Sequence, residues 1–345
     1  FSKEKQIDMV VVAPDDPLAA GMVDALEEAG IRAFGPNKAA AVIEGSKSFA
    51  KELMKKYNIP TADYEVFYNS NDAINYLKDK KYPIVVKADG LALGKGVIIA
   101  QSFEEAKKAV ESIMDDRVFG DAGQKVVIEE FLVGKEVSML AFTDGKTIKT
   151  MVPSQDHKRA LDNDQGLNTG GMGTFSPSRI YTDEIHNYCM EKIYKPTVEA
   201  MSKEGRKFKG VLYFGLILTE DGPKVLEYNA RFGDPETQVV LPRLQTDILE
   251  IFNAVIDERL DEIEIEWDDN ACVCVIMASG GYPEKYKTGY EITGIDEAER
   301  DINTVVFHAG TKRENGKYYT AGGRVLGVTS LESNLEAAIK KAYEG

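Results

Sequence analysis

The sequence is poor in cysteine, histidine and tryptophan, and it has no excess of positive charge. Of its 345 residues three are cysteine, three are histidine and one is tryptophan, and the formal net charge is −15. A protein that binds nucleic acid or a membrane surface by its general charge needs an outward basic field, so neither partner is expected. An anionic small ligand is not excluded, because it needs only a local cationic pocket.

The three cysteines do not have the spacing of a metal site or of a disulfide framework. Cys272 and Cys274 lie in an apolar run, residues 271–278, that is typical of a buried strand, and neither a CxxC pair nor a histidine cluster accompanies them. We therefore expect small core side chains in a reducing, cytoplasmic compartment.

Long apolar runs and a signal peptide are also missing from the sequence. No run approaches the roughly 20 residues of a membrane-spanning helix, and the stretch from Phe1 to Gln6 is charged. The chain starts without Met, in what resembles the last turns of a helix, so we expect a truncation at the N-terminus.

The order of predicted elements indicates an α/β segment followed by α+β units. Residues 7–13 are an apolar run expected as a strand buried on both faces, and a helix at residues 17–29 and a strand at 31–34 complete a β-α-β pattern. Residues 154–178 are polar and glycine-rich and are expected as a long functional loop. Further strands are predicted at residues 64–68, 84–87, 97–100, 126–131, 136–143, 211–219, 224–228 and from 270 onward, and helices at 45–57, 102–114, 186–205 and 237–260.

A glycine-rich loop lies between two of these strands. Gly90, Gly94 and Gly96 surround Lys95, and β-branched residues follow at once. A Walker A loop or a Rossmann loop would open a helix, and neither spacing is present. What remains is a strand–loop–strand flap whose backbone N–H groups, with Lys87 and Lys95, hold phosphate oxygens. A solvated hairpin with surface lysines stays open as an alternative at this point.

The next predicted strand ends in residues 129–132, where backbone groups could bind an adenine edge. Glu136 follows, within reach of ribose hydroxyls. The alternative for Glu129 and Glu130 is an exposed strand end.

The third segment of interest is the strand that carries Glu227 and Asn229. Because strand side chains alternate, these two are expected on one side while Leu226 and Tyr228 face the core. Two hard oxygen ligands suit Mg²⁺, and Arg231 could bind a carboxylate or an acyl phosphate beside it. A half-exposed strand with polar alternation is the competing interpretation.

The chain has a glycine-rich flap, then the strand end at residues 129–132, then the strand that carries Glu227 and Asn229. These elements, in this order, resemble those of the ATP-grasp ligases. Within them the chain is similar to the phosphoribosylamine–glycine ligase family, the glycinamide ribonucleotide synthetases, over practically its whole length. The motifs that carry this resemblance lie at residues 34–36, 44–47, 86–91, 94–96, 128–132, 154–159, 168–173, 229–238, 308–311 and 322–326.

The resemblance implies an ATP-grasp fold of the α/β and α+β multidomain class. Residues 1–44 would be the remnant of a doubly wound N-terminal domain, and residues 266–345 a small strand-rich C-terminal domain. Residues 45–265 would form the ATP-grasp region, with a flap subdomain at about 62–125 and a central subdomain made of 45–61 and 126–265.

The resemblance also implies a reaction: ATP-dependent ligation of glycine to 5-phosphoribosylamine through glycyl phosphate, in purine biosynthesis. The cofactors would be ATP and Mg²⁺, with Mn²⁺ as a second possibility. The partners would be small-molecule substrates, and we expect a monomer while leaving an oligomer open. Two alternatives are another ATP-grasp ligase, including a biotin-carboxylase-like enzyme, and a non-catalytic nucleotide-binding module.

Matching the family motifs residue by residue implies the following roles. The ATP-binding residues would be Lys47, Lys87, Gly94, Lys95 and Gly96 at the phosphates, Glu129, Phe131 and Leu132 at adenine, and Glu136 at the ribose. Glu227 and Asn229 would bind the metal. Arg231, Asp156 and Lys87 would be catalytic, and the substrate-binding residues would be Asp156, Lys158, Arg159, Gly171, Arg231 and Arg324, with Arg324 favoured for the 5′-phosphate.

Two departures from the family pattern stand out. The usual N-terminal Gly-Gly-Arg-Glu-His segment is missing, so the ribosylamine side of the site is expected to be incomplete. Asp15 stands where the family usually has Glu.

Overall fold

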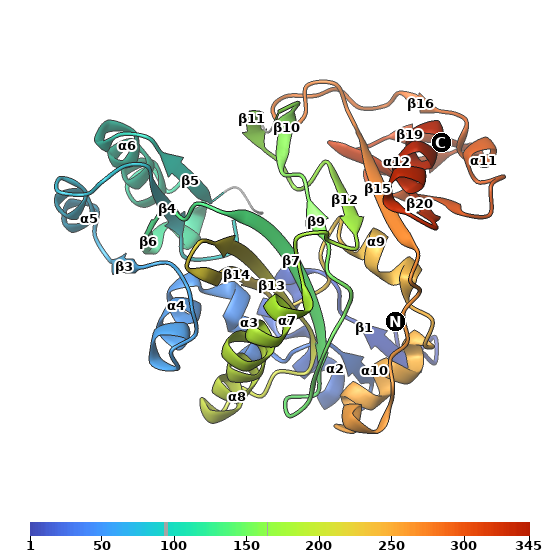
Figure 1. Cartoon of the computed structure of the whole chain (residues 1–345), viewed down its shortest axis with the longest axis horizontal. Helices are drawn as coiled ribbons and strands as arrows, with labels where there is room; N and C mark the ends of the chain where they lie inside the picture. Colours follow the sequence, from blue (N-terminus) through green and yellow to red (C-terminus); the bar gives the residue numbers. More distant parts are fainter. Residues whose placement is uncertain (93–95, 164) are drawn as a thin grey trace.

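The computed structural model describes residues 1–92, 96–163 and 165–345 (Figure 1). Gly94 and Lys95 of the predicted flap therefore lie outside the described residues. A flap lobe, residues 64–130, and a C-terminal lobe, residues 271–345, stand on opposite sides of a central sheet (Figure 1).

The N-terminal segment is a small parallel β-α-β unit. Strand β1 (Met9–Val11) pairs with β2 (Arg32–Phe34), and helices α1 (Asp15–Ala20) and α2 (Met22–Glu28) connect them. The predicted single helix at 17–29 is wrong, because Gly21 adopts a φ of 95° and interrupts it. The predicted strand at 7–13 is shorter than expected and is not buried on both faces, since Val11 is 40% exposed. Helix α3 (Lys38–Gly45) follows and was not predicted.

The flap lobe is a four-stranded antiparallel sheet in the order β3-β6-β4-β5, with two helices packed on it. Its elements are β3 (Tyr64–Phe67), α5 (Ser70–Leu77), β4 (Ile84–Ala88), β5 (Val97–Ala100), α6 (Phe103–Met114), a 3₁₀ turn (Gly120–Gln124) and β6 (Val126–Glu130). Ser102 is the N-cap of α6, since its Oγ accepts the N–H of Glu105 at 3.3 Å. Helix α5 was missed.

The central sheet has the order β14-β13-β7-β8 and is covered on both faces. Its strands are β7 (Lys135–Thr143), β8 (Ile148–Thr150), β13 (Gly210–Thr219) and β14 (Gly222–Asn229). Alternate side chains of β13 divide between two cores: Phe214 packs with helical residues such as Tyr194, and Tyr213 lies in the core that contains Phe252. The helices around the sheet are α4 (Lys47–Lys56), α7 (Asp183–Cys189), a π-helix (Met190–Tyr194), α8 (Lys195–Lys203), α9 (Thr237–Val240), α10 (Ile248–Ile256) and short 3₁₀ turns at Leu241–Arg243 and Leu260–Glu262.

A β-bulge changes the predicted facing of β14. Gly215 pairs with Glu227 whereas Leu216 pairs with Val225, so Leu226 is the extra residue. The prediction that Leu226 faces the core is wrong: Val225 and Tyr228 are the buried residues, and Leu226 is half-buried.

The C-terminal lobe is built on a five-stranded sheet in the order β17-β20-β15-β12-β9. Its elements are β15 (Ala271–Ala278), β16 (Glu291–Ile292), α11 (Ile295–Ala298), β17 (Thr304–His308), β18 (Thr311–Glu314), β19 (Lys317–Thr320), β20 (Arg324–Glu332) and α12 (Leu335–Glu344). Two strands of this sheet come from the stretch that was predicted to be a loop, which instead holds β9 (Gln155–Asp156), β10 (Arg159–Leu161), β11 (Gln165–Asn168) and β12 (Gly173–Ser176). In the part of the chain that the structure describes, no helix is long and apolar enough to span a bilayer.

Candidate active site

The first turn of α4 is tied to the loop that follows β4. Asp89 accepts the N–H of Ser48 at 2.6 Å through its side chain and the N–H of Lys47 at 2.8 Å through its backbone oxygen. The Lys47 ammonium donates to the backbone oxygen of Gly90 at 3.0 Å. The predicted phosphate-binding lysine therefore lies against the start of the glycine-rich loop.

A buried carboxylate, Glu129, lies between two lysines. Its side chain is 2% exposed, and its oxygens lie 2.9 Å from Lys51 Nζ and 2.9 Å from Lys87 Nζ. Burial acts to raise the pKa of Glu129, but the two lysines outweigh it and the pKa lies below its usual value. Burial also lowers the pKa of Lys51 to about 8. The alternative of an exposed strand end is wrong for Glu129, and Lys51 is a site residue that the sequence did not indicate.

Four cationic side chains lie close enough to Glu227, the predicted metal ligand, for their charges to act on it. Burial acts to raise the pKa of this carboxylate, but the charges of Lys158, Lys87 and Lys47, with Arg231, lower it below its usual value. Within residues 1–92, 96–163 and 165–345 no three His, Cys, Asp or Glu side chains are placed to hold a metal ion together. Such a concentration of positive charge around one carboxylate suits a polyanion and a divalent cation bound together.

Arg231 is held by Glu44, a residue for which no role was predicted. Arg231 Nη2 lies 3.0 Å from Glu44 Oε1 and 3.4 Å from Asn229 Oδ1, and the second Glu44 oxygen accepts the N–H of Ala230 at 2.7 Å. Burial raises the pKa of Glu44 to about 7, although Arg231 opposes the shift. The acid in the motif at residues 44–47 thus holds Arg231, which lies just beyond the end of β14.

Asp156 is a largely buried carboxylate on β9. Its Oδ1 atom is buried without a hydrogen-bond partner among the described residues. Burial, and then the charge of Glu236, raise the pKa of Asp156 to about 8, against the opposing charges of Lys158 and Arg324. A buried acceptor of this kind is ready to receive a hydrogen-bond donor from a ligand.

Glu236 is a second buried acid that the sequence did not indicate. Its Oε1 atom accepts hydrogen bonds from Ser138 Oγ at 3.0 Å and from Tyr213 OH at 3.1 Å. The only sequence signal was its place in the motif at residues 229–238, because burial and partners follow from the packing of β7 and β13.

The predicted ribose ligand Glu136 forms an ion pair with Lys158. The two side chains are 2.9 Å apart, and that of Glu136 is 52% exposed. Although burial opposes it, the charges of Glu136 and Glu227 hold the pKa of Lys158 well above its usual range. Arg159 instead donates to the backbone oxygen of Gly166 within its own hairpin at 2.9 Å.

Other predicted site residues lie at the ends of strands. Phe131 and Leu132 directly follow β6, and Phe131 is exposed. The backbone oxygen of Gly96 accepts the N–H of Ala88 at 2.8 Å, which closes the base of the flap. Arg324 donates to the loops that carry Gly171 and Asp234.

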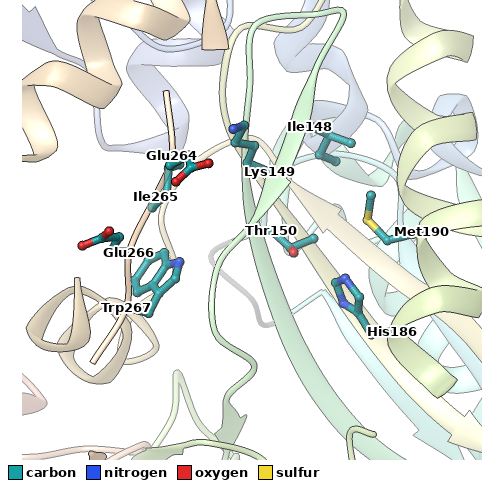
Figure 2. A pocket seen from close by; sticks show the side chains of 9 residues that line it. All are labelled: Ile148, Lys149, Thr150, His186, Met190, Glu264, Ile265, Glu266 and Trp267. Carbon is teal, nitrogen blue, oxygen red and sulfur yellow. The ribbon is translucent and has the colours of Figure 1, made fainter. Parts of the chain in front are cut away.

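A separate surface hollow of about 440 Å³ shares no residue with this site (Figure 2). Figure 2 shows that strand β8, the α7 region and the linker before β15 line it. Its lining residues are Ile148, Lys149, Thr150, His186, Met190, Glu264, Ile265, Glu266 and Trp267. The converging charges, rather than this hollow, identify the candidate active site.

Models of the three phosphoribosylglycinamide synthetase domains match consecutive parts of the chain. The N domain matches residues 1–44, the ATP-grasp (A) domain residues 45–237 and the C domain residues 272–345. The chain belongs to the phosphoribosylglycinamide synthetase family.

Known members of the synthetase family are similar to this chain over its whole length. The phosphoribosylamine–glycine ligase of Halalkalibacterium halodurans is 51% identical over 344 residues, which are 100% of this chain and 79% of the relative. That of Caldanaerobacter subterraneus is 49% identical, over 99% of this chain and 82% of the relative. The family predicted from the sequence is confirmed.

Solved structures, including one of the synthetase family, superpose on this chain and confirm the ATP-grasp fold. The phosphoribosylamine–glycine ligase of Thermotoga maritima superposes with a TM-score of 0.81 at 37% identity, covering 91% of this chain and 78% of its own. The biotin carboxylase domain of Hydrogenobacter thermophilus 2-oxoglutarate carboxylase, solved with MgADP and bicarbonate, gives 0.77 at 17% identity, covering 99% of this chain and 74% of its own, and shows the fold alone.

Proposed function

We propose that the chain ligates glycine to 5-phosphoribosylamine at the expense of ATP, giving glycinamide ribonucleotide, ADP and phosphate in purine biosynthesis. The observation that carries this proposal is that the charges of four cationic side chains act on Glu227, in a chain that is about half identical to phosphoribosylamine–glycine ligases. Phosphoryl transfer needs such charge neutralisation and in-line positioning more than it needs a nucleophilic side chain.

The ATP half of the site would combine the flap and the central sheet. Lys47 and Lys87 would bind the phosphates, with the backbone of Gly94, Lys95 and Gly96 above them. Because the Glu129 carboxylate is already bonded to two lysines, it would act by fixing Lys87. The backbone of Phe131 and Leu132 would meet adenine, and Glu136 would accept from the ribose.

Glu227 and Asn229 would hold the divalent cation. They supply two hard oxygens on one side of β14, and Mg²⁺ or Mn²⁺ would take its other ligands from phosphate oxygens and water. When bound, the cation neutralises phosphate charge that develops during transfer.

The acyl half of the site would use Arg231 and Asp156. A glycine carboxylate oxygen attacks the γ-phosphorus while ADP leaves, and Arg231 would orient that carboxylate. The ribosylamine nitrogen then attacks the acyl carbon, phosphate leaves and the nitrogen loses a proton. Asp156 would hold a substrate amine beside Gly171.

The 5′-phosphate of the ribosylamine would be bound by basic side chains near this amine site. Lys158, Arg159 and Arg324 are the candidates. Among the described residues, no hydrogen bond uses the Nε–H or the second Nη2–H of Arg324, so both can make such a contact. We also propose small-molecule partners alone, a monomer and a cytoplasmic location.

The test is release of ADP that depends on both glycine and phosphoribosylamine. Glu227→Ala should lower turnover at least about 100-fold, whereas Glu220→Ala, in the exposed turn of the same hairpin, should not change it. Turnover with bicarbonate but not with glycine would favour a biotin-carboxylase-like enzyme. ATP binding without any turnover would favour a non-catalytic module.

A further inference from the structure

Arg324 belongs to the C-terminal lobe, yet it joins two loops that flank Asp156. We infer that Arg324 is a positioning residue, which holds these loops so that Asp156 can receive the amine of glycine. The inference rests on the role proposed above for Asp156, and it adds to any contact of Arg324 with the 5′-phosphate.

The guanidinium of Arg324 connects segments that are far apart in the sequence. Its Nη1 donates to the backbone oxygens of Gly170 at 2.8 Å and Asp234 at 2.9 Å, and its Nη2 lies 2.9 Å from the Asp234 carboxylate. The Arg324 side chain is only 20% exposed. A charged donor makes stronger hydrogen bonds than a neutral one, so one side chain fixes the spacing of both loops.

The Gly171 loop packs directly on Asp156 and on the Pro235 loop. A side chain at Gly171 would place its Cβ 2.7 Å from one Asp156 oxygen and 3.0 Å from the other, and it would also collide with Pro235. Gly171 has a φ of 111°, which favours glycine as well. The room for a ligand at Asp156 is therefore set by how closely the Gly171 and Pro235 loops approach each other.

A second contact from the C-terminal lobe holds the same loop. The N–H of Gly170 donates to Tyr282 OH at 3.1 Å. The ring of Tyr282 lies against Gly323, the neighbour of Arg324, where any side chain would collide with it. Tyr282 thus accepts a hydrogen bond from the N–H of Gly170, while Arg324 donates one to the carbonyl oxygen of the same residue.

Asp234 distinguishes positioning from phosphate binding. A carboxylate beside the guanidinium would weaken the attraction of Arg324 for a phosphate dianion, but it strengthens the link between Arg324 and the Pro235 loop. If Arg324 acted on phosphate alone, the loss of Asp234 would leave binding unchanged or improve it.

The experiment is a double-mutant cycle on kinetic constants. Arg324→Ala and Asp234→Ala should each raise KM for glycine about tenfold, and the double variant should add little to either, because both residues serve one link. Arg313→Ala, an exposed arginine on β18 of the same lobe, should leave KM for glycine unchanged. Arg324→Lys should not rescue it, because an ammonium group cannot bridge both loops.

Three results would overturn the inference. An unchanged KM for glycine in Asp234→Ala, with Arg324→Ala raising only KM for phosphoribosylamine, leaves Arg324 as a phosphate ligand alone. Additive effects of Arg324→Ala and Asp234→Ala on KM for glycine would show that the two residues do not act through one shared link. An unchanged KM for glycine in Asp156→Asn removes the amine site, while an unmodified chain that never uses glycine refutes the proposed function itself. If Arg324→Ala does not fold, Asp234→Ala alone decides between the first result and the inference.

Discussion

Arg231 Nη2 lies 3.0 Å from Glu44 Oε1, and the other oxygen of Glu44 accepts the N–H of Ala230 at 2.7 Å. Helix α3 therefore holds the two residues that follow β14. The contact joins an acid near the end of the N-terminal segment to the arginine proposed to orient the glycine carboxylate.

Glu44→Gln should loosen Arg231 without removing it. We expect KM for glycine to rise and kcat/KM for glycine to fall about tenfold, because a misplaced guanidinium orients the carboxylate less well. Steady-state kinetics with saturating ATP measure this. Glu28→Gln, on the exposed side of α2, is the matched control. Unchanged glycine kinetics in Glu44→Gln would show that Arg231 holds its position by other contacts.

Glu129→Gln should destabilise the protein strongly. The substitution leaves Lys51 and Lys87 buried without their shared counter-charge, and breaking a buried ion pair costs about 3–5 kcal/mol. Chemical denaturation measures the loss. Glu130→Gln is the control, since the neighbouring Glu130 is exposed and only weakly paired with Lys224 at 3.7 Å.

The contribution of Glu129 and its two lysines to the free energy of unfolding should depend on pH. The folded pKa of Glu129 is lowered, so its stabilising contribution is present above the ordinary carboxylate pKa and is lost as the pH falls through the folded value. The difference in unfolding free energy between the unsubstituted protein and Glu129→Gln should therefore shrink in acid. A difference that stays constant down to acid unfolding would contradict this account of the lysine pair.

Asp156 should affect the pH dependence of stability in the opposite direction to Glu129, because its folded pKa is raised and not lowered. Its folded pKa is raised from 3.8 to about 8, so the folded protein prefers the neutral acid, and this contribution is full below the unfolded pKa and lost as pH rises through 8. Relative to the unsubstituted protein, Asp156→Asn should gain on the order of 2 kcal/mol between pH 4 and pH 9, since partial solvent access screens the effect.

Thermal or urea unfolding across this pH range tests the Asp156 prediction. Asp162→Asn, an exposed acid in the same glycine-rich stretch, should track the unsubstituted protein. Parallel curves for Asp156→Asn and Asp162→Asn would mean that Asp156 titrates like a surface carboxyl.

Lys95→Ala should raise KM for ATP and leave stability within about 0.5 kcal/mol. Lys95 lies outside the described residues, so this prediction rests on the glycine-rich sequence, in which a flap contributes little to the core. ATP-dependent kinetics and melting temperature are the measurements, with the exposed Lys108→Ala of α6 as control. A large fall in melting temperature for Lys95→Ala would refute the flap interpretation.

The sequence determined the features that depend on near neighbours in the chain. Ser102 caps α6 because its partner is three residues away, and the hairpin of β13 and β14 forms across a tight turn that ends at Gly222. The same holds for the glycine-rich loop between β4 and β5, and the family motifs were sufficient to predict the ATP-grasp fold.

Only the tertiary structure decided the features that depend on distant partners. Strand β12 forms because it pairs with β15, about 100 residues later in the chain, so its polar sequence alone suggested a loop. The bulge at Leu226 depends on the register of β13 against β14, and no single strand reveals it. In the site, the same limit applies to Lys51, Glu44 and Glu236: their sequence neighbours do not show that they are buried. Their roles follow from partners that the fold brings within hydrogen-bonding distance.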